Sequence, residues 1–221
     1  MSSHVMQPDA SSLLPRSAAS PRTLSFPILT LDERKLTPAL GYLFNRKWLD
    51  PCESLVSILW KFERANGAPG HIVARLARPD IDPYEGIVPE LGEVDIDRLR
   101  ENLAVPVGTL QMASLQPSQR RRYSHVFRHC RRCIAHGYHS ALHQMESIRT
   151  CPAHHRVLEA ECRRCGYQAP YRVSVRLLES PYRCASCRAS YGGQGWMPDK
   201  PLMKAEYRKA FTRRYFERHL G

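Results

Sequence analysis

The pattern of apolar residues predicts short helices in the N-terminal half of the chain, residues 1–119. Segment 53–65 carries four apolar residues that fall three or four positions apart, on one face of a helix: Leu55, Ile58, Leu59 and Phe62. Asn66-Gly67 follows this segment as a stop signal. A second short helix is predicted over residues 69–78, directly after this tight turn. The pair is therefore predicted to resemble a helix-turn-helix unit.

The rest of the N-terminal half is predicted to alternate loops with short helices. Residues 80–95 are acidic and contain two prolines and two glycines, which predicts a loop. Helical spacing returns at residues 96–103 and at residues 109–115. Residues 26–119 are therefore predicted to form a helical, helix-turn-helix-like domain. Residues 1–25 are rich in Ser, Pro and Ala, and we expect them to be disordered because they offer little apolar surface to bury.

An amphipathic pattern returns at the C-terminal end, where residues 196–221 are predicted to contain a basic helix. Within residues 200–219, four apolar residues recur every four positions: Met203, Tyr207, Phe211 and Tyr215. Lysines and arginines cover the remaining faces of this helix. The apolar face is predicted either to pack on the preceding domain or to dock a partner.

Cysteines and histidines form the strongest chemical pattern in the chain. Seven of the eight cysteines lie between Cys130 and Cys187. Four ligand pairs, each with two residues between its members, follow in order: Cys130/Cys133, Cys151/His154, Cys162/Cys165 and Cys184/Cys187. This spacing lets a tight turn aim two ligands at one ion and is typical of zinc ribbons. Residues 120–195 are therefore predicted to form a tandem zinc-binding domain with small zinc-ribbon or zinc-knuckle β elements, in a chain that is otherwise mainly α-helical.

The order of the pairs predicts two structural zinc ions. The simplest partition places the first two pairs on one ion and the last two pairs on the other. A cross-braced pairing of first with third and second with fourth is the alternative, and His155 is an alternative to His154. Four protein ligands close a tetrahedral site, whereas a catalytic zinc keeps one position for water. Cys52 lies far from these pairs and is predicted to be a plain buried or half-buried thiol.

The net charge of +12 is concentrated in the C-terminal half, residues 120–221. This half holds 21 Lys and Arg against 7 Asp and Glu, whereas the N-terminal half holds 12 against 14. Arginine makes bidentate contacts with phosphate, so the C-terminal half is predicted to contact nucleic acid. The densest basic stretch supplies the candidate contacts: Arg120, Arg121, Arg122, Arg128, Arg131 and Arg132. Tyr123 and Phe127 lie among them and suit base stacking, and a solvated linker is the alternative.

Composition and motifs narrow the class of protein. No apolar run approaches the roughly 20 residues that span a bilayer, and the first residues lack the apolar core of a secretory signal. Because the cysteines also form metal-type pairs, we expect a cytoplasmic protein without a membrane partner. The chain has no His-Glu-x-x-His, Gly-x-Ser-x-Gly or P-loop motif, so we expect no enzymatic activity.

Two groups of motif residues resemble those of the TniQ family of transposon target-selection proteins, over roughly residues 25–187. The family opens its first helix with Pro-x-Glu-Ser-Leu, and the corresponding residues here are Pro51-Cys52-Glu53-Ser54-Leu55. It continues with Cys-x-x-Cys, an aromatic residue, Cys-Pro-x-His-x-x-x-Leu and Cys-x-x-Cys-Gly. The matching residues here are Cys130/Cys133, Tyr138, Cys151 to Leu158 and Cys162 to Gly166. The chain departs from the family at His143, where a Trp is frequent.

The resemblance implies a non-enzymatic adaptor in DNA transposition. Such proteins link a target-recognition element, either DNA or an RNA-guided complex, to the AAA ATPase and the transposase of the transposon. The implied partners are DNA or a nucleic-acid–protein complex together with these two proteins, and a homodimer is among the associations that the sequence allows. In a bacterial cell, this predicts a cytoplasmic protein that associates with the nucleoid. The alternative function is a DNA-binding transcriptional regulator with a helix-turn-helix and a zinc ribbon.

Overall fold

The computed structural model describes residues 42–219, except for the side chains of residues 119–121 and 218–219. This part is mainly helical, and its β structure consists of isolated bridges. The helical elements are η3 Arg46–Trp48, α2 Leu55–Asn66, α3 Gly70–Ala77, α4 Ile96–Leu103, α5 Val107–Ala113, η4 Pro117–Arg122, α6 Arg131–His136, η5 Ala141–Gln144, α7 Val175–Leu178 and α8 Ala205–His219. The mainly α-helical prediction is confirmed, while the disorder expected for residues 1–25 lies outside the described residues. None of the described helices is long and apolar enough to cross a membrane.

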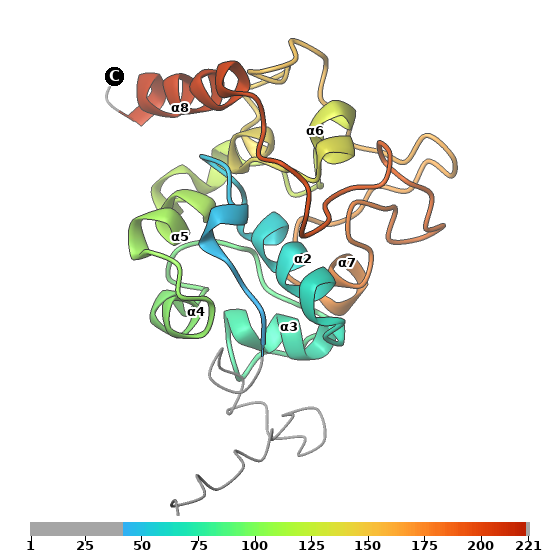
Figure 1. Cartoon of the computed structure of the whole chain (residues 1–221). Helices are drawn as coiled ribbons and strands as arrows, with labels where there is room; N and C mark the ends of the chain where they lie inside the picture. Colours follow the sequence, from blue (N-terminus) through green and yellow to red (C-terminus); the bar gives the residue numbers. More distant parts are fainter. Residues whose placement is uncertain (1–41, 220–221) are drawn as a thin grey trace, which may run out of the picture.

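Helix α2 (Leu55–Asn66) lies at the centre of the fold (Figure 1). Its start is capped by Ser54, whose side chain accepts a hydrogen bond from the backbone N–H of Ser57. It ends at Gly67, which adopts the left-handed conformation (φ 59°) that glycine allows without strain. Every residue from Leu55 to Phe62 is buried. The predicted helix is therefore confirmed, and it is covered on all sides rather than along one stripe.

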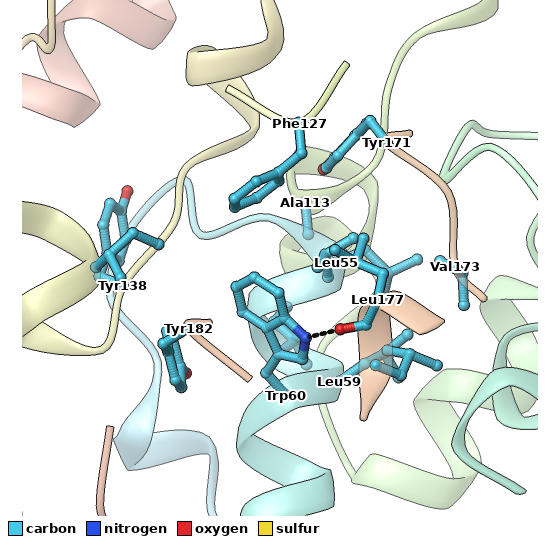
Figure 2. Packing of buried hydrophobic residues seen from close by; sticks show 14 of the residues in the cluster. Leu55, Leu59, Trp60, Ala113, Phe127, Tyr138, Tyr171, Val173, Leu177 and Tyr182 are labelled. Atoms are coloured by element: carbon cyan, nitrogen blue, oxygen red, sulfur yellow. Dashed lines mark hydrogen bonds between the residues drawn. The ribbon is translucent and has the colours of Figure 1, made fainter. Parts of the chain in front are cut away.

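A single hydrophobic core joins the two halves of the chain. Trp60 of α2 is buried, and its indole N–H donates a 2.9 Å hydrogen bond to the backbone oxygen of Leu177 in α7 (Figure 2). The Trp60 ring centroid also lies 5.5 Å from that of Phe127 and 5.0 Å from that of Tyr182. Because these partners belong to the C-terminal half, the core continues across residue 119. The metal-binding part of the chain therefore packs directly on the central helix.

The short helices of the N-terminal half lie near the predicted positions. α3 (Gly70–Ala77) packs on α2, on α7 and on α4 (Ile96–Leu103), and α4 packs on α5 (Val107–Ala113). Most side chains of α3 are buried, and only His71 and Arg75 of this helix are half-buried. The helices themselves are confirmed, whereas a DNA-reading helix-turn-helix arrangement stays a prediction.

Helix α8 (Ala205–His219) covers one end of the molecule, away from α3 and α4 (Figure 1). It begins at Ala205, later than the pattern of residues 200–219 suggests. The apolar residues predicted for its inner face do contact the core: Met203 and Phe211 are buried, and Tyr207 and Tyr215 pack beside them. The Phe211 ring centroid lies 4.9 Å from that of Tyr138. The interpretation of a helix packed on the preceding domain is therefore confirmed.

Two buried histidines, His139 and His143, lie in the core that α2 and α8 share. Ser54 Oγ lies 2.7 Å from His139 Nδ1, and His139 Nε2 lies 2.9 Å from the backbone oxygen of Arg128. Gln144 Nε2 also lies 3.1 Å from His139 Nε2, so polar groups contact both nitrogens of the ring. Burial lowers the pKa of His139 well below its ordinary value and lowers the pKa of His143 to about 3. Both rings are therefore neutral in the folded chain near neutral pH.

Replacing His143 by glutamine is expected to reduce the sensitivity of the fold to acid. An unfolded histidine has a pKa of about 6.5, so below that pH the unfolded chain takes up a proton that buried His143 does not bind until about pH 3. The stability that this neutral ring contributes is present above about pH 6.5 and is lost as the pH falls, by up to about 1.4 kcal/mol per pH unit. Glutamine keeps the local structure, because the residue at this position accepts from the Ser140 N–H in a capping box.

Urea unfolding of the metal-loaded chain, from about pH 7 to about pH 5, measures this effect. The free energy of unfolding should fall less steeply with acid in His143→Gln than in the unchanged chain. The slope of the unfolding free energy against pH is the readout, because the substitution can also change the stability at neutral pH. Equal slopes in the two proteins would show that His143 does not titrate in the expected way.

Candidate metal centres

The four ligand pairs come together as two separate clusters in the described part of the chain. The first cluster consists of Cys130, Cys133, Cys151 and His154, and the second of Cys162, Cys165, Cys184 and Cys187. Within each cluster, the candidate ligand atoms all lie within 4.8 Å of one another. This is the sequential partition predicted from the order of the pairs, and the cross-braced alternative is wrong. His155 is exposed and does not belong to the first cluster.

The first cluster has the dimensions of a tetrahedral site with three sulfurs and one nitrogen. His154 Nδ1 lies 3.6, 3.3 and 3.6 Å from the three cysteine sulfurs in chain order. The sulfurs of Cys133 and Cys151 are 3.6 Å apart. Zinc–sulfur bonds of about 2.3 Å and zinc–nitrogen bonds of about 2.0 Å give tetrahedral edges of about 3.5 to 3.8 Å. The four donor atoms therefore fit one four-coordinate metal ion.

Three parts of the chain enclose the first cluster. Cys130 lies at the N-terminal cap of α6 (Arg131–His136). Cys151 opens a tight turn that is closed by backbone hydrogen bonds. The His154 ring packs on Tyr207 of α8, with 4.6 Å between the ring centroids. All three cysteines are buried, so this cluster belongs to the interior of the fold.

The second cluster has a matching geometry but lies nearer the surface. The sulfurs of Cys162 and Cys187 are 3.6 Å apart, and those of Cys165 and Cys184 are 3.7 Å apart. A tetrahedral zinc site with four sulfurs has edges of about 3.8 Å. Cys165 is exposed and Cys187 is half-buried, whereas the other two cysteines are buried. This cluster also fits one four-coordinate ion, with one side open to solvent.

A common backbone turn places the ligands of three of the four pairs. The residue after the second ligand is left-handed in each: His155 (φ 51°), Gly166 (φ 71°) and Arg188 (φ 59°). Its N–H donates to the backbone oxygen of the first ligand, at 2.8 to 2.9 Å. Glycine adopts this conformation without strain, and Arg188 is held by hydrogen bonds to Glu179 and Ser180. A glycine at this position, as at Gly166, is a signal from which the turn can be predicted, whereas His155 and Arg188 give no such signal.

The structure places the predicted nucleic-acid contacts in different environments. The guanidinium group of Arg128 donates to the backbone oxygens of Met145 and Ile148, at 2.9 and 2.7 Å. Those donors hold the fold together and are not directed to solvent. Arg120 and Arg121 belong to the 3-10 helix η4, but their side chains lie outside the described residues. The exposed members of the set are Arg122, Arg131 and Arg132. Phosphate contact by the set stays a prediction.

The aromatic residues of the basic stretch are not available for base stacking. Tyr123 is 8% exposed and Phe127 is 1% exposed. The Phe127 ring stacks on His129, with 5.5 Å between the ring centroids, and it also contacts Trp60 in the core. The prediction that these rings stack on nucleic-acid bases is therefore wrong, because both serve the packing between the two halves.

Comparison with known proteins gives no family for this chain. A scan against protein-family models found no match, and a search of curated proteins found none either. The resemblance to the TniQ family rests on the motif residues alone and stays a prediction.

Proposed function

We propose that this chain is a zinc-stabilised, non-enzymatic adaptor that acts in target selection during DNA transposition. Each cluster holds one zinc ion in this proposal, because thiolate and imidazole donors at tetrahedral spacing suit zinc. The observation that carries the proposal is that both clusters supply four protein ligands. A metal ion bound by four protein ligands has no position left for a reacting water, so its role is structural.

The motif residues support the place of the adaptor in transposition. Glu53, Ser54 and the Cys151–His154 pair carry the TniQ resemblance, and here they cap and anchor α2 and build the first cluster. The acidic segment 80–95 suits a basic protein surface, and the basic C-terminal half suits nucleic acid. We therefore propose that the N-terminal half contacts the AAA ATPase or the transposase. The C-terminal half contacts DNA or an RNA-guided complex, in the cytoplasm at the nucleoid.

The burial of α3 favours the adaptor over a transcriptional regulator. A recognition helix presents several side chains to base edges in the major groove. Within α3, however, only His71 and Arg75 are half-buried and the rest are buried against α2, α4 and α7. A helix-turn-helix that reads DNA through α3 would therefore have few residues with which to do so.

The gene neighbourhood and a binding assay test the adaptor proposal. The gene is expected beside genes for a transposase and an AAA ATPase. The full-length chain should co-purify with that ATPase, and insertion at the selected target should depend on the chain in a reconstituted reaction. A neighbourhood without transposition genes, or target-selected insertion without this chain, would contradict the proposal and favour the regulator.

Replacing Arg120, Arg121 and Arg122 by glutamine is expected to lower the salt dependence of DNA binding. Each phosphate contact contributes about −0.9 to the slope of log affinity against log salt on duplex DNA. If each arginine contacts a phosphate, the triple change lowers the slope by roughly 3. Fluorescence anisotropy with a labelled duplex, from about 50 to about 200 mM salt, measures it.

A matched control removes three exposed cations from the N-terminal half, through Arg46→Gln, Lys47→Gln and Arg100→Gln. Its slope should stay within about 1 of that of the unchanged chain. An unchanged slope in the variant at residues 120–122 would count against phosphate contact by this stretch.

A further inference from the structure

A basic depression of about 350 Å³ lies between α6 and the loop that follows the second cluster. Four arginines and one acid supply its charged groups: Arg131, Arg132, Arg156, Arg163 and Glu159. Three segments that are distant in the sequence build it, namely α6, residues 156–163 and the loop at Gly192. Their charges leave the basic depression with a net of three positive charges.

The side chains of two arginines in the basic depression are not used by the fold. The side chains of Arg132 and Arg156 are exposed and make no hydrogen bond or ion pair within the described part of the chain. Other arginines of the C-terminal half are used, because Arg128 and Arg172 each donate two hydrogen bonds to backbone oxygens. Arg132 and Arg156 therefore have their donors free for an external anion.

The other charged groups of the basic depression are held in place. Arg131 Nε donates to the backbone oxygen of Tyr191 at 3.0 Å, which leaves its terminal nitrogens for another acceptor. Gly192 contacts α6 so closely that a Cβ there would lie 2.1 Å from the backbone oxygen of Arg131. Arg163 makes two 2.8 Å hydrogen bonds to Glu159, so these two charges offset each other. These contacts hold the lining of the basic depression in place before any ligand binds.

We propose that the basic depression binds the phosphate backbone of nucleic acid. Guanidinium groups match phosphate oxygens with two parallel hydrogen bonds, and Arg131, Arg132 and Arg156 offer three such groups without a compensating acid. Val157, which is 71% exposed, lies in the same depression and offers an apolar contact for a sugar. The inference rests on the proposed function, in which the C-terminal half holds nucleic acid, and it adds Arg156 to the candidate phosphate contacts.

The direct test is the full-length chain with Arg132→Gln and Arg156→Gln. The slope of log affinity for duplex DNA against log salt should fall by about 2, and affinity near 100 mM salt should fall about tenfold or more. Neither side chain supports the fold, so the variant should keep two metal ions per chain and an unchanged melting temperature. Unchanged affinity and slope in this folded variant would overturn the proposal.

A matched control removes two positive charges from the same half at another place. Arg149 and Arg214 line a separate groove beside α8. Arg149→Gln with Arg214→Gln should change the slope by less than half as much as the pair in the basic depression. If the two double variants reduce the slope equally, DNA is attracted by the overall positive charge of this half and not by a defined site. That result would also overturn the proposal.

The substitution Glu159→Gln gives a test in the opposite direction. It removes the acid from the basic depression and releases Arg163, so DNA affinity should rise several-fold and the slope should steepen by about 1. A variant that had merely lost its fold would not show such a gain in affinity at this site. A loss or no change would contradict the proposal.

Two further measurements separate this proposal from its rivals. A polyglutamate peptide probes for an acidic protein partner. If the change at Arg132 and Arg156 abolishes binding of polyglutamate but not of DNA, the basic depression is a protein site and the proposal is wrong. Association with the AAA ATPase tests the proposed function independently. The variant with Arg132→Gln and Arg156→Gln should still bind the ATPase. A chain that binds DNA through the basic depression but not the ATPase would keep this inference and reject the adaptor.

Discussion

Replacing Cys151 by serine is expected to release one metal ion and to unfold the C-terminal half of the chain. The Cys151 sulfur is buried in the first cluster, 3.6 Å from both Cys133 Sγ and His154 Nδ1. A structural zinc contributes folding free energy on the order of 10 kcal/mol, comparable with the whole stability of a domain, about 5 to 15 kcal/mol. Because Trp60 of α2 has its core partners in the C-terminal half, we expect the loss to reach the central helix as well.

Elemental analysis of the purified protein and far-ultraviolet circular dichroism measure this effect. The unchanged chain should carry two zinc ions, and Cys151→Ser should carry at most one and lose helical signal. Cys52→Ser is the matched control, because Cys52 is a buried thiol outside both clusters, and burial raises its pKa to about 12. It should keep both ions. An unchanged chain with one ion or none, or a Cys151→Ser chain that keeps two, would show that the clusters are not the metal sites proposed.

Local signals explain which parts of the structure could be predicted from the sequence. Ser54 and Gly67 act on backbone groups within four residues of themselves, so the limits of α2 are visible without any tertiary contact. Each metal-ligand pair likewise spans one turn of backbone. The sequential partition followed because neighbouring pairs need no long-range crossing of the chain. The residues that form the two candidate clusters were therefore predictable from the spacing of the pairs.

Long-range packing explains what could not be predicted. Arg128 and Arg132 look alike in a basic stretch, but Arg128 meets the carbonyl oxygens of Met145 and Ile148, which another segment brings to it. Arg156 stands outside that stretch and joins the basic depression only because the turn after Cys151 carries it towards α6. The roles of such residues depend on contacts that spacing along the chain does not encode.

Removing the amino group of Lys61 is expected to destabilise the fold by about 3 to 5 kcal/mol. Lys61 Nζ lies 2.8 Å from both carboxylate oxygens of Glu53, and the two side chains are 2% and 1% exposed. Glu53 also accepts from the Asp50 N–H and the Ser57 hydroxyl, and Lys61 donates to the backbone oxygen of Trp48 at 2.7 Å. Lys61→Met keeps the apolar stem but leaves the carboxylate buried without a counter-charge. The Glu of the Pro-x-Glu-Ser-Leu motif thus anchors the start of α2.

The cost of Lys61→Met should depend on pH in a defined direction. Burial raises the pKa of Glu53 above its ordinary value even though Lys61 acts to lower it. Without Lys61, the folded pKa rises further, while the unfolded carboxyl keeps a pKa of about 4.3. Between these two values the folded chain binds a proton that the unfolded chain has released, so stability rises as the pH falls. The destabilisation should therefore be largest at about pH 7 and smaller at about pH 5.

Urea unfolding at both pH values, with a double variant and a surface control, tests this role. Glu53→Gln combined with Lys61→Met leaves no unpaired charge and should recover at least about half of the loss caused by Lys61→Met alone. Arg213→Gln removes an exposed pair with Glu217, at 3.5 Å, and should change stability by no more than about 0.5 kcal/mol. If Lys61→Met costs no more than this control, or if its cost grows towards acid pH, the buried pair does not anchor α2 electrostatically. The Glu53 position would then owe its effect to packing and to its hydrogen bonds with Ser57 and the Asp50 N–H.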